Sequence, residues 1–195
     1  NKLAETLGVE LEIVDVNGDT RIPALVSGQI DVIIANITGN LTRAQTIDFS
    51  IPYLRAGIKM MTQADSAYHT IADLNTPDAK VAVGRGTTGE ALVLKDAPNA
   101  TITYVDAFTD QQVLLEQGRV DATVNDELTY LDYVKEHPDA KLAVAAETDP
   151  AESAFAFTKQ KTALVKAVDE ALAKLQADGT LAKIGEKYFG QDVSQ

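Results

Sequence analysis

A cluster of polar side chains follows an apolar run that ends near residue 36. Thr38, Asn40 and Thr42 are natural N-cap residues for a short helix, and that helix would carry Arg43. The guanidinium of Arg43 presents a planar fork of donors that suits a carboxylate or a phosphate. The alternative interpretation is that Arg43 is an ordinary surface cation.

A second candidate site is the glycine-rich segment Gly84–Gly89, which reads Gly-Arg-Gly-Thr-Thr-Gly and follows an apolar run. Such a loop directs backbone N–H groups and the N-terminus of the next helix at an anion. The spacing also fits the G-x-G-x-x-G dinucleotide motif, and Asp106 stands roughly where that motif places a ribose-binding acid. The bound anion would be either a carboxylate or a pyrophosphate.

A carboxylate, Asp126, follows a third apolar run. At the end of a strand it suits an ammonium group, although it would serve equally well as a helix N-cap. An arginine fork, a set of N–H donors and one carboxylate are together the groups that a zwitterion needs. The sequence contains no Cys and only two histidines, His69 and His137. Neither a Ser-His-Asp arrangement nor a cluster of metal ligands accompanies the three groups, so we expect no catalytic site, metal or cofactor.

Two similar stretches, Leu25–Asn36 and Leu115–Asp126, indicate an internal repeat. In each, a helix ends at a glycine, one residue follows, and Ile-Asp or Val-Asp opens a strand that ends in Asn or Asp. Chance recurrence of a common helix–strand junction is the alternative. If the repeat reflects two similar lobes, their strand ends would face a shared cleft, with Asn36 and Asp126 at that cleft.

Helices and strands alternate with short connections, which favours an α/β fold with largely parallel sheet. The expected strands are Leu11–Val16, Ile30–Ala35, Ile58–Thr62, Lys80–Val83, Ile102–Val105, Val120–Val124, Leu142–Ala145 and Ala154–Phe157. The expected helices are Arg21–Ser27, Ile71–Leu74, Gly89–Lys95, Asp110–Gln117, Leu128–Glu136 and two C-terminal helices separated at Gly179.

The composition limits the classes of function. The 195 residues are 45% hydrophobic, which is enough for a packed core, and carry a formal net charge of -12. That charge disfavours binding to duplex nucleic acid or anionic lipid, because both require a basic face. No apolar run is long enough to span a membrane, and no signal peptide is present. The chain opens inside an expected helix, residues 1–8, so we expect that an N-terminal segment is missing.

Five stretches carry a resemblance to a known family: Ile22–Ala35, Thr42–Tyr53, Val83–Thr88, Gly118–Ala122 and Asp178–Gly190. In these stretches the chain resembles bacterial extracellular solute-binding proteins of family 3. The stretches occur in the same order as in that family and cover nearly the whole chain. The resemblance implies a type II periplasmic binding fold of class α/β. In that fold, two lobes are joined by a two-stranded hinge, and each lobe is an open, mostly parallel sheet flanked by helices. The expected lobes are residues 1–57 with 154–195, and residues 58–153. The hinge is expected near residues 58–63 and 143–154.

The same resemblance implies a role for each candidate residue. Arg43 would hold the α-carboxylate of a free amino acid, together with the N–H and hydroxyl groups of Thr38. The loop N–H donors of Thr88, with Thr87 beside it, would bind the same carboxylate. Asp126 would pair with the α-ammonium group. The backbone carbonyl at Asn36 would accept from that ammonium group as well.

The chain departs from the family pattern in two ways. The usual opening strand and its ligand-stacking aromatic residue are absent, which would leave one sheet short of a central strand. In addition, Gly39-Asn40 replaces the commoner pair of an apolar residue and Thr before the arginine. Asn40 would therefore be able to reach the side chain of a ligand.

We expect a monomeric binding protein that delivers a free polar amino acid to the membrane permease of an ABC importer. Its location would be the periplasm, or the cell exterior with a lipid anchor in a Gram-positive organism. Alternatives are an enzyme of the cyclohexadienyl dehydratase type, with Glu152 or Glu90 as general acid, an amino-acid-sensing receptor domain, and a nicotinamide-binding enzyme. The sequence does not specify which amino acid is bound.

Overall fold

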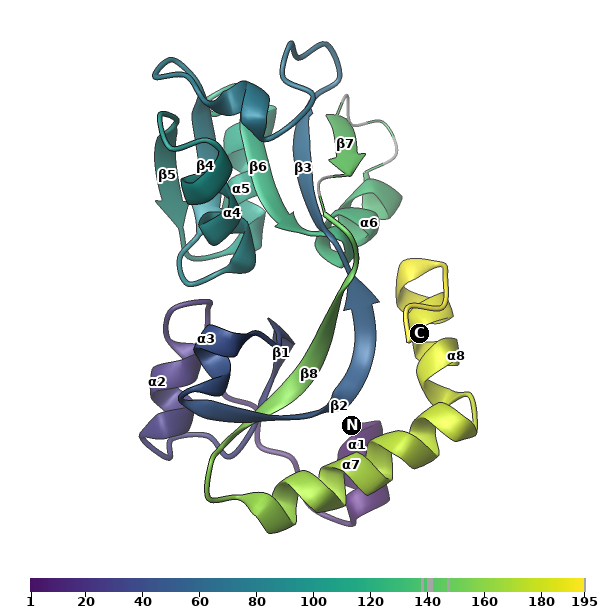
Figure 1. Ribbon diagram of the computed structural model, residues 1–195. Helices are drawn as coiled ribbons and strands as arrows, with labels where there is room; N and C mark the ends of the chain where they lie inside the picture. The colour runs from purple at the N-terminus through teal and green to yellow at the C-terminus, as the bar shows by residue number, and fades with distance from the viewer. Residues whose placement is uncertain (138, 140–141, 147, 195) are drawn as a thin grey trace. The chain divides into compact units, whose positions relative to one another are not determined.

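In the computed structural model (Figure 1), the chain divides into two compact units, which are described one at a time. Unit 1 comprises Asn1–Val16, Thr20–Arg55 and Ala151–Gln195, and unit 2 comprises Asn17–Asp19 and Ala56–Pro150. The structure describes residues 1–137, 139, 142–146 and 148–194. Among these residues, no helix combines the length and the apolar character that a membrane span requires.

Unit 1 is built on a three-stranded sheet in the order β1-β8-β2. The strands are β1 (Ile33–Thr38), β2 (Ile47–Ala56) and β8 (Ala151–Thr158). The helices are α1 (Lys2–Leu7), α2 (Arg21–Val26), α3 (Leu41–Ala44), α7 (Thr162–Ala177) and α8 (Thr180–Phe189). Because neighbouring side chains on a strand point to opposite faces, Ala156 packs with Leu25 of α2 while Phe155 and Phe157 pack with Leu172 of α7.

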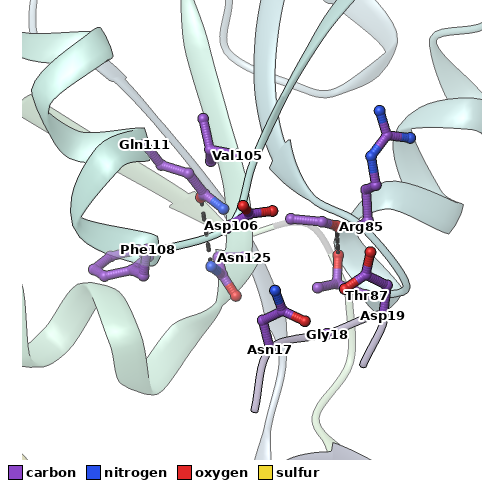
Figure 2. A pocket seen from close by; sticks show the side chains of 11 residues that line it. Asn17, Gly18, Asp19, Arg85, Thr87, Val105, Asp106, Phe108, Gln111 and Asn125 are labelled. Carbon is purple, nitrogen blue, oxygen red and sulfur yellow. Dashed lines mark hydrogen bonds between the residues drawn. The ribbon is translucent and has the colours of Figure 1, made fainter. Parts of the chain in front are cut away.

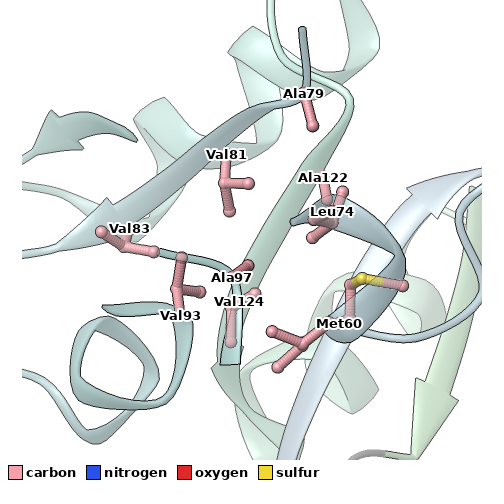
Figure 3. Packing of buried hydrophobic residues seen from close by; sticks show 10 residues of the cluster. Met60, Leu74, Ala79, Val81, Val83, Val93, Ala97, Ala122 and Val124 are labelled. Carbon is pink, nitrogen blue, oxygen red and sulfur yellow. The ribbon is translucent and has the colours of Figure 1, made fainter. Parts of the chain in front are cut away.

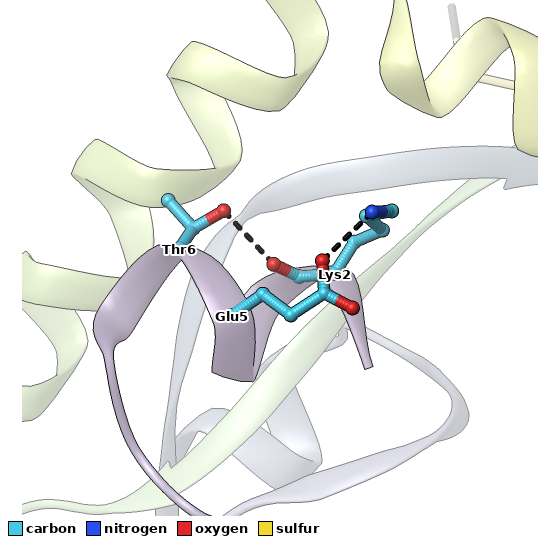
Figure 4. Close-up of polar contacts among 3 residues, drawn as sticks. All are labelled: Lys2, Glu5 and Thr6. Atoms are coloured by element: carbon cyan, nitrogen blue, oxygen red, sulfur yellow. Dashed lines mark hydrogen bonds and ion pairs between the residues drawn. The ribbon is translucent and has the colours of Figure 1, made fainter.

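Helix α1 is held by its apolar side rather than by its charges. Lys2 and Glu5 form an ion pair with a Nζ–Oε2 distance of 2.7 Å, and the Thr6 hydroxyl donates to the Lys2 carbonyl at 2.8 Å (Figure 4). Both charged side chains are well exposed, so this pair contributes little to stability. Leu3 and Leu7 instead pack against the buried cluster that α7 forms with β8, which places α1 on α7.

Unit 2 contains a five-stranded sheet in the order β5-β4-β6-β3-β7. The strands are β3 (Ile58–Gln63), β4 (Lys80–Gly84), β5 (Thr101–Val105), β6 (Ala122–Asp126) and β7 (Leu142–Ala146). The helices are η1 (Ala72–Leu74), α4 (Thr88–Asp96), α5 (Phe108–Glu116) and α6 (Glu127–Glu136). β4 pairs in parallel with β5 and with β6, since α4 and α5 supply the crossovers that parallel pairing requires.

The sheet of unit 2 is buried on both faces (Figure 3). One face carries Met60, Val81 and Val124, which pack with Val93 of α4 and Leu74 of η1. The opposite face carries Met61 and Ala82, which pack with side chains of α5 and α6. The apolar runs of the sequence become the inner strands because each residue, whichever way it points, meets a helix.

The structure confirms the α/β class and most of the expected helices and strands, with five corrections. Leu11–Val16 forms no strand: no described strand pairs with it, and Ile13 is 74% exposed. Strand β1 begins at Ile33 rather than Ile30, and β2 was not expected. Among the strand pairs whose register is described, β4 is parallel to β5 and β6, whereas β3 pairs antiparallel with β6 and β7, and β1 antiparallel with β8.

The fifth correction concerns the expected hinge. Ile58–Gln63 is not a free crossover but β3, which is hydrogen-bonded on both sides inside the five-stranded sheet. Its central residues, Met60 and Met61, are buried on opposite faces, and this burial fixes the strand in unit 2. Within the other expected crossover, residue 147 lies outside the described residues.

Replacing Leu74 tests the packing of unit 2. Leu74 is fully buried, so Leu74→Ala leaves a cavity and should lower the free energy of unfolding by about 2–5 kcal/mol. Leu94→Ala, at a position that is 51% exposed, should change it by less than about 0.5 kcal/mol. Urea unfolding followed by circular dichroism measures both, and equal effects would contradict the burial described above.

Candidate functional site

The candidate residues of unit 1 lie at the end of β1 and on the short helix α3. Asn40 caps α3, because its Oδ1 accepts the Arg43 backbone N–H at 2.8 Å. The Arg43 guanidinium turns back toward the strand, and its Nη1 donates to the Thr38 carbonyl at 2.8 Å. The structure therefore brings Thr38, Asn40 and Arg43 into one hydrogen-bonded group. The Arg43 side chain is half-buried and is held by the last residue of β1, whereas an ordinary surface cation would be exposed.

Asn36 occupies an irregular point of β1. Its φ angle of 48° lies in the left-handed region, which no other described non-glycine residue adopts. The pairing of β1 with β8 shifts register between Ile33 and Ile37, and the buried Arg21 donates from Nη1 to the Ala35 carbonyl at 2.8 Å. Ser153 Oγ donates to Asn36 Oδ1 at 3.1 Å and fixes the side chain. Asn36 is among the residues that tolerate this backbone conformation best.

The candidate residues of unit 2 begin with the glycine-rich loop between β4 and α4. Thr87 is the N-cap of α4: its hydroxyl accepts the Glu90 N–H at 3.1 Å and donates to the Gly84 carbonyl at 2.8 Å. Glu90 Oε2 in turn accepts the Gly86 N–H at 2.7 Å. The N–H groups of Thr88 and Gly89 open the helix and have no acceptor within it, so they can serve an anion.

Asp126 lies at the same edge of the sheet as this loop. It ends β6, the parallel neighbour of β4, and the carboxyl ends of parallel neighbours lie side by side. A Cβ added to Gly89 would lie only 2.8 Å from the Val124 carbonyl oxygen, so the start of α4 is pressed directly onto β6. Asp126 occupies the N-cap position of α6, yet its side chain makes no capping hydrogen bond.

The guanidinium of Arg85 lies outside the loop, whereas the carboxylate of Glu90 contacts it. The guanidinium of Arg85 stacks on the Tyr104 ring with its Cζ 3.7 Å from the ring centroid, and Figure 2 shows it pointing away from Thr87. Partial burial raises the pKa of Tyr104, and its hydrogen bond with Glu90 raises it further. The donors that the loop offers to an anion are therefore main-chain groups, not the guanidinium of Arg85.

A pocket of about 150 Å³ opens beside the loop within unit 2 (Figure 2). The sequence did not predict this pocket, and it suggested for Asp106 only the place of a ribose-binding acid in a dinucleotide motif. It is lined by Asn17, Gly18, Asp19, Gly84, Arg85, Thr87, Val105, Asp106, Phe108, Gln111 and Asn125. The signal in the sequence is the Asn-Gly-Asp run at 17–19, which is distant from the other lining residues and becomes their neighbour only in the fold.

The structure thus gives two groups of candidate residues, one in each unit. Unit 1 holds Asn36, Thr38, Asn40 and Arg43 along β1 and α3, and unit 2 holds Thr87, Thr88 and Asp126 at one sheet edge. Within the described part of the chain, no group of three or more His, Cys, Asp or Glu side chains is placed to hold a metal ion.

Removing the Thr87 hydroxyl should loosen the loop. Thr87→Ala deletes both hydrogen bonds of the N-cap and should lower the free energy of unfolding by about 1 kcal/mol. Thr87→Ser keeps the hydroxyl and should retain most of that stability. Chemical denaturation of the two variants measures the difference, and equal stability would show that the cap is not formed.

At position 36 the usual preference of a strand for valine over glycine should be reversed. Valine is normally favoured over glycine in a strand, but at a positive φ the β-branched side chain is strained. Asn36→Val should therefore be less stable than Asn36→Gly by about 1 kcal/mol or more. Ile34, also on β1 but without a positive φ, supplies the control, since Ile34→Val should be more stable than Ile34→Gly. Thermal unfolding of the four variants tests the reversal.

Comparison with known proteins places this geometry in a family. The profile of bacterial extracellular solute-binding proteins, family 3, matches residues 1–191. The L-cystine-binding protein TcyJ of Escherichia coli (strain K12) is 37% identical over 198 residues, covering 100% of this chain and 73% of the relative. The L-cystine-binding protein TcyA of Bacillus subtilis (strain 168) is 30% identical over 200 residues, covering 100% and 71%. A solved structure of an ancestral arginine-binding protein bound to arginine is 36% identical with a TM-score of 0.90, covering 97% of this chain and 84% of that one. The chain belongs to the bacterial extracellular solute-binding proteins, family 3.

Proposed function

We propose that this protein binds a free polar amino acid and delivers it to the membrane permease of an ABC importer. The observation that carries the proposal is the division of charge between the two groups of residues. One unit presents the Arg43 fork, and the other presents main-chain N–H donors beside the carboxylate of Asp126. Relatives named for binding L-cystine and arginine, both of them amino acids, support this reading.

Each charged end of the amino acid has its own set of partners in the proposal. Arg43, Thr38 and the N–H groups of Thr88 and its neighbour in the first turn of α4 bind the α-carboxylate. Asp126 and the carbonyl of Asn36 accept from the α-ammonium group. Charge-assisted hydrogen bonds of this kind are stronger than neutral ones, and an unpaired charge is costly once water is excluded.

Binding in two steps follows from the separation of these groups. The ligand docks on one lobe, and closure of the other lobe adds the remaining partners, as in hinge-type binding proteins. The proposed lobes are residues 1–57 with 154–195, and residues 58–153. A dissociation constant between micromolar and nanomolar corresponds to about 8–12 kcal/mol of binding free energy.

A binding role without chemistry accounts for the side chains that would otherwise suggest an enzyme. Glu90, a possible general acid, is committed to the Gly86 N–H and to the Tyr104 hydroxyl. A pyrophosphate bound in the glycine-rich loop would compete with the Glu90 carboxylate for the Gly86 N–H and would be repelled by it. We further propose that the protein acts as a monomer in the periplasm, or outside the cell on a lipid anchor.

The test is amino-acid binding by the wild type and by a variant at Arg43. A thermal-shift screen of the twenty amino acids identifies ligands, since a ligand at a hundredfold excess over its dissociation constant adds about 2.7 kcal/mol of apparent stability.

The variant Arg43→Ala should then bind the best ligand about a hundredfold or more weakly in calorimetry, because the carboxylate loses its charged partner. Arg55→Ala removes an exposed arginine of the same unit and should leave affinity unchanged. Unchanged affinity in Arg43→Ala would refute the proposed function.

A further inference from the structure

The irregular point of β1 at Asn36 is held by two buried side chains that lie outside the groups proposed to bind the ligand. Arg21, the first residue of α2, is 7% exposed, and its Nη1 donates to the Ala35 carbonyl at 2.8 Å. Ser153 of β8 is 2% exposed, and its Oγ donates to Asn36 Oδ1 at 3.1 Å. One contact holds the backbone directly before Asn36, and the other holds the Asn36 side chain.

The burial of Arg21 is costly, because its guanidinium loses the solvation of water. The pairing of β1 with β8 shifts register between Ile33 and Ile37, and an interrupted ladder leaves backbone groups that other partners must satisfy. The Ala35 carbonyl lies in that interval, and Arg21 supplies a donor to it. The arginine thus stabilises an irregular backbone that the ladder alone would not hold.

The backbone conformation of Asn36 needs such support. Its φ angle of 48° lies in the left-handed region, which is uncommon for a residue other than glycine. Conformations of this kind persist only where the surrounding structure enforces them, and they gather at ligand-binding sites. Asn36 is itself a proposed ligand contact through its backbone carbonyl, so the enforced conformation and the proposed contact coincide at one residue.

We propose that Arg21 and Ser153 are positioning residues, which hold Asn36 so that its carbonyl is oriented for the ammonium group before the ligand binds. The inference rests on the proposed function and adds to that site two residues that act through Asn36. Without either contact, this part of β1 would sample other conformations, and only the fraction in the competent conformation would bind. The apparent affinity would fall in proportion to that fraction.

The end of β1 beyond Asn36 is held by the same kind of contact. Arg43 Nη1 donates to the Thr38 carbonyl at 2.8 Å, so the carbonyls of Ala35 and Thr38 each accept from an arginine. The two arginines differ in their surroundings, since Arg43 is half-buried and Arg21 is buried. Arg21 therefore acts on the backbone of β1 rather than on the ligand.

The experiment is calorimetric titration with the amino acid that the wild type binds most tightly among the twenty and L-cystine. Ser153→Ala should weaken binding about threefold or more, the loss expected from one neutral hydrogen bond. Arg21→Met keeps the length of the side chain but not its donors, and should weaken binding about tenfold or more. Arg21→Lys keeps a charged donor and should bind more tightly than Arg21→Met.

A matched control separates positioning from general stability. Ser50 is likewise buried in the sheet of unit 1, where its Oγ donates to the Ile51 carbonyl at 2.7 Å and accepts the Phe155 N–H at 2.9 Å. Ser50→Ala should therefore lower the free energy of unfolding, measured by chemical denaturation, at least as much as Ser153→Ala does. It should nevertheless bind the amino acid like the wild type, whereas Ser153→Ala should not.

A double-mutant cycle tests whether Ser153 acts through Asn36. Asn36→Gly keeps the backbone carbonyl and permits the same φ angle, but it removes the Oδ1 that Ser153 contacts. In that background Ser153→Ala should have no further effect on affinity, because the hydrogen bond is already absent. An equal loss of affinity in both backgrounds would overturn the inference.

The remaining outcomes distinguish this inference from the proposed function. Wild-type affinity in both Ser153→Ala and Arg21→Met would overturn the inference while leaving amino-acid binding in place. Circular dichroism verifies that each variant is folded, and if Arg21→Met does not fold, Ser153→Ala and the cycle decide. Failure of the wild type to bind any of the amino acids would overturn the proposed function and the inference together.

Discussion

A free amino acid carries two opposite charges, on an ammonium group and a carboxylate group bonded to the same carbon atom, and both must find partners when water leaves the binding site. In the proposed function, much of the structure around the candidate residues meets this constraint. Asn40 caps the helix that carries Arg43, and the Thr38 carbonyl orients the guanidinium. In unit 2, a glycine-rich turn exposes the first N–H groups of α4 beside the strand that ends in Asp126. The backbone of the strands and helices thus fixes the positions of the guanidinium, the N–H donors and the carboxylate.

The sequence predicted elements well where packing and local chemistry agree. The apolar runs of β4 and β6 are buried on both faces. The strand expected at Lys80–Val83 is found at Lys80–Gly84, and the one expected at Val120–Val124 is found at Ala122–Asp126. The cap at Asn40 also followed from residue type, because this side chain acts within three residues of its own position, whereas the cap at Thr87 was not predicted. The family assignment made from short motifs was confirmed by a profile match over residues 1–191.

Features that depend on distant partners could not be predicted. Leu11–Val16 has the pattern of a strand, but a strand also needs a neighbour to pair with, and a pattern cannot supply one. The irregular backbone at Asn36 depends on Arg21 and Ser153, which lie 15 and 117 positions away in the chain. The pocket of unit 2 combines residues 17–19 with residues near 85, 106 and 125. The lobe boundaries and the joint action of the two groups of site residues stay predictions.

The close approach of Gly89 to the Val124 carbonyl has a consequence for any attempt to redesign this protein. A side chain at position 89 would push the start of α4 away from β6, and so separate the anion donors from Asp126. That position is therefore closed to variation. Any variant designed to bind another amino acid would therefore keep this glycine and change other positions.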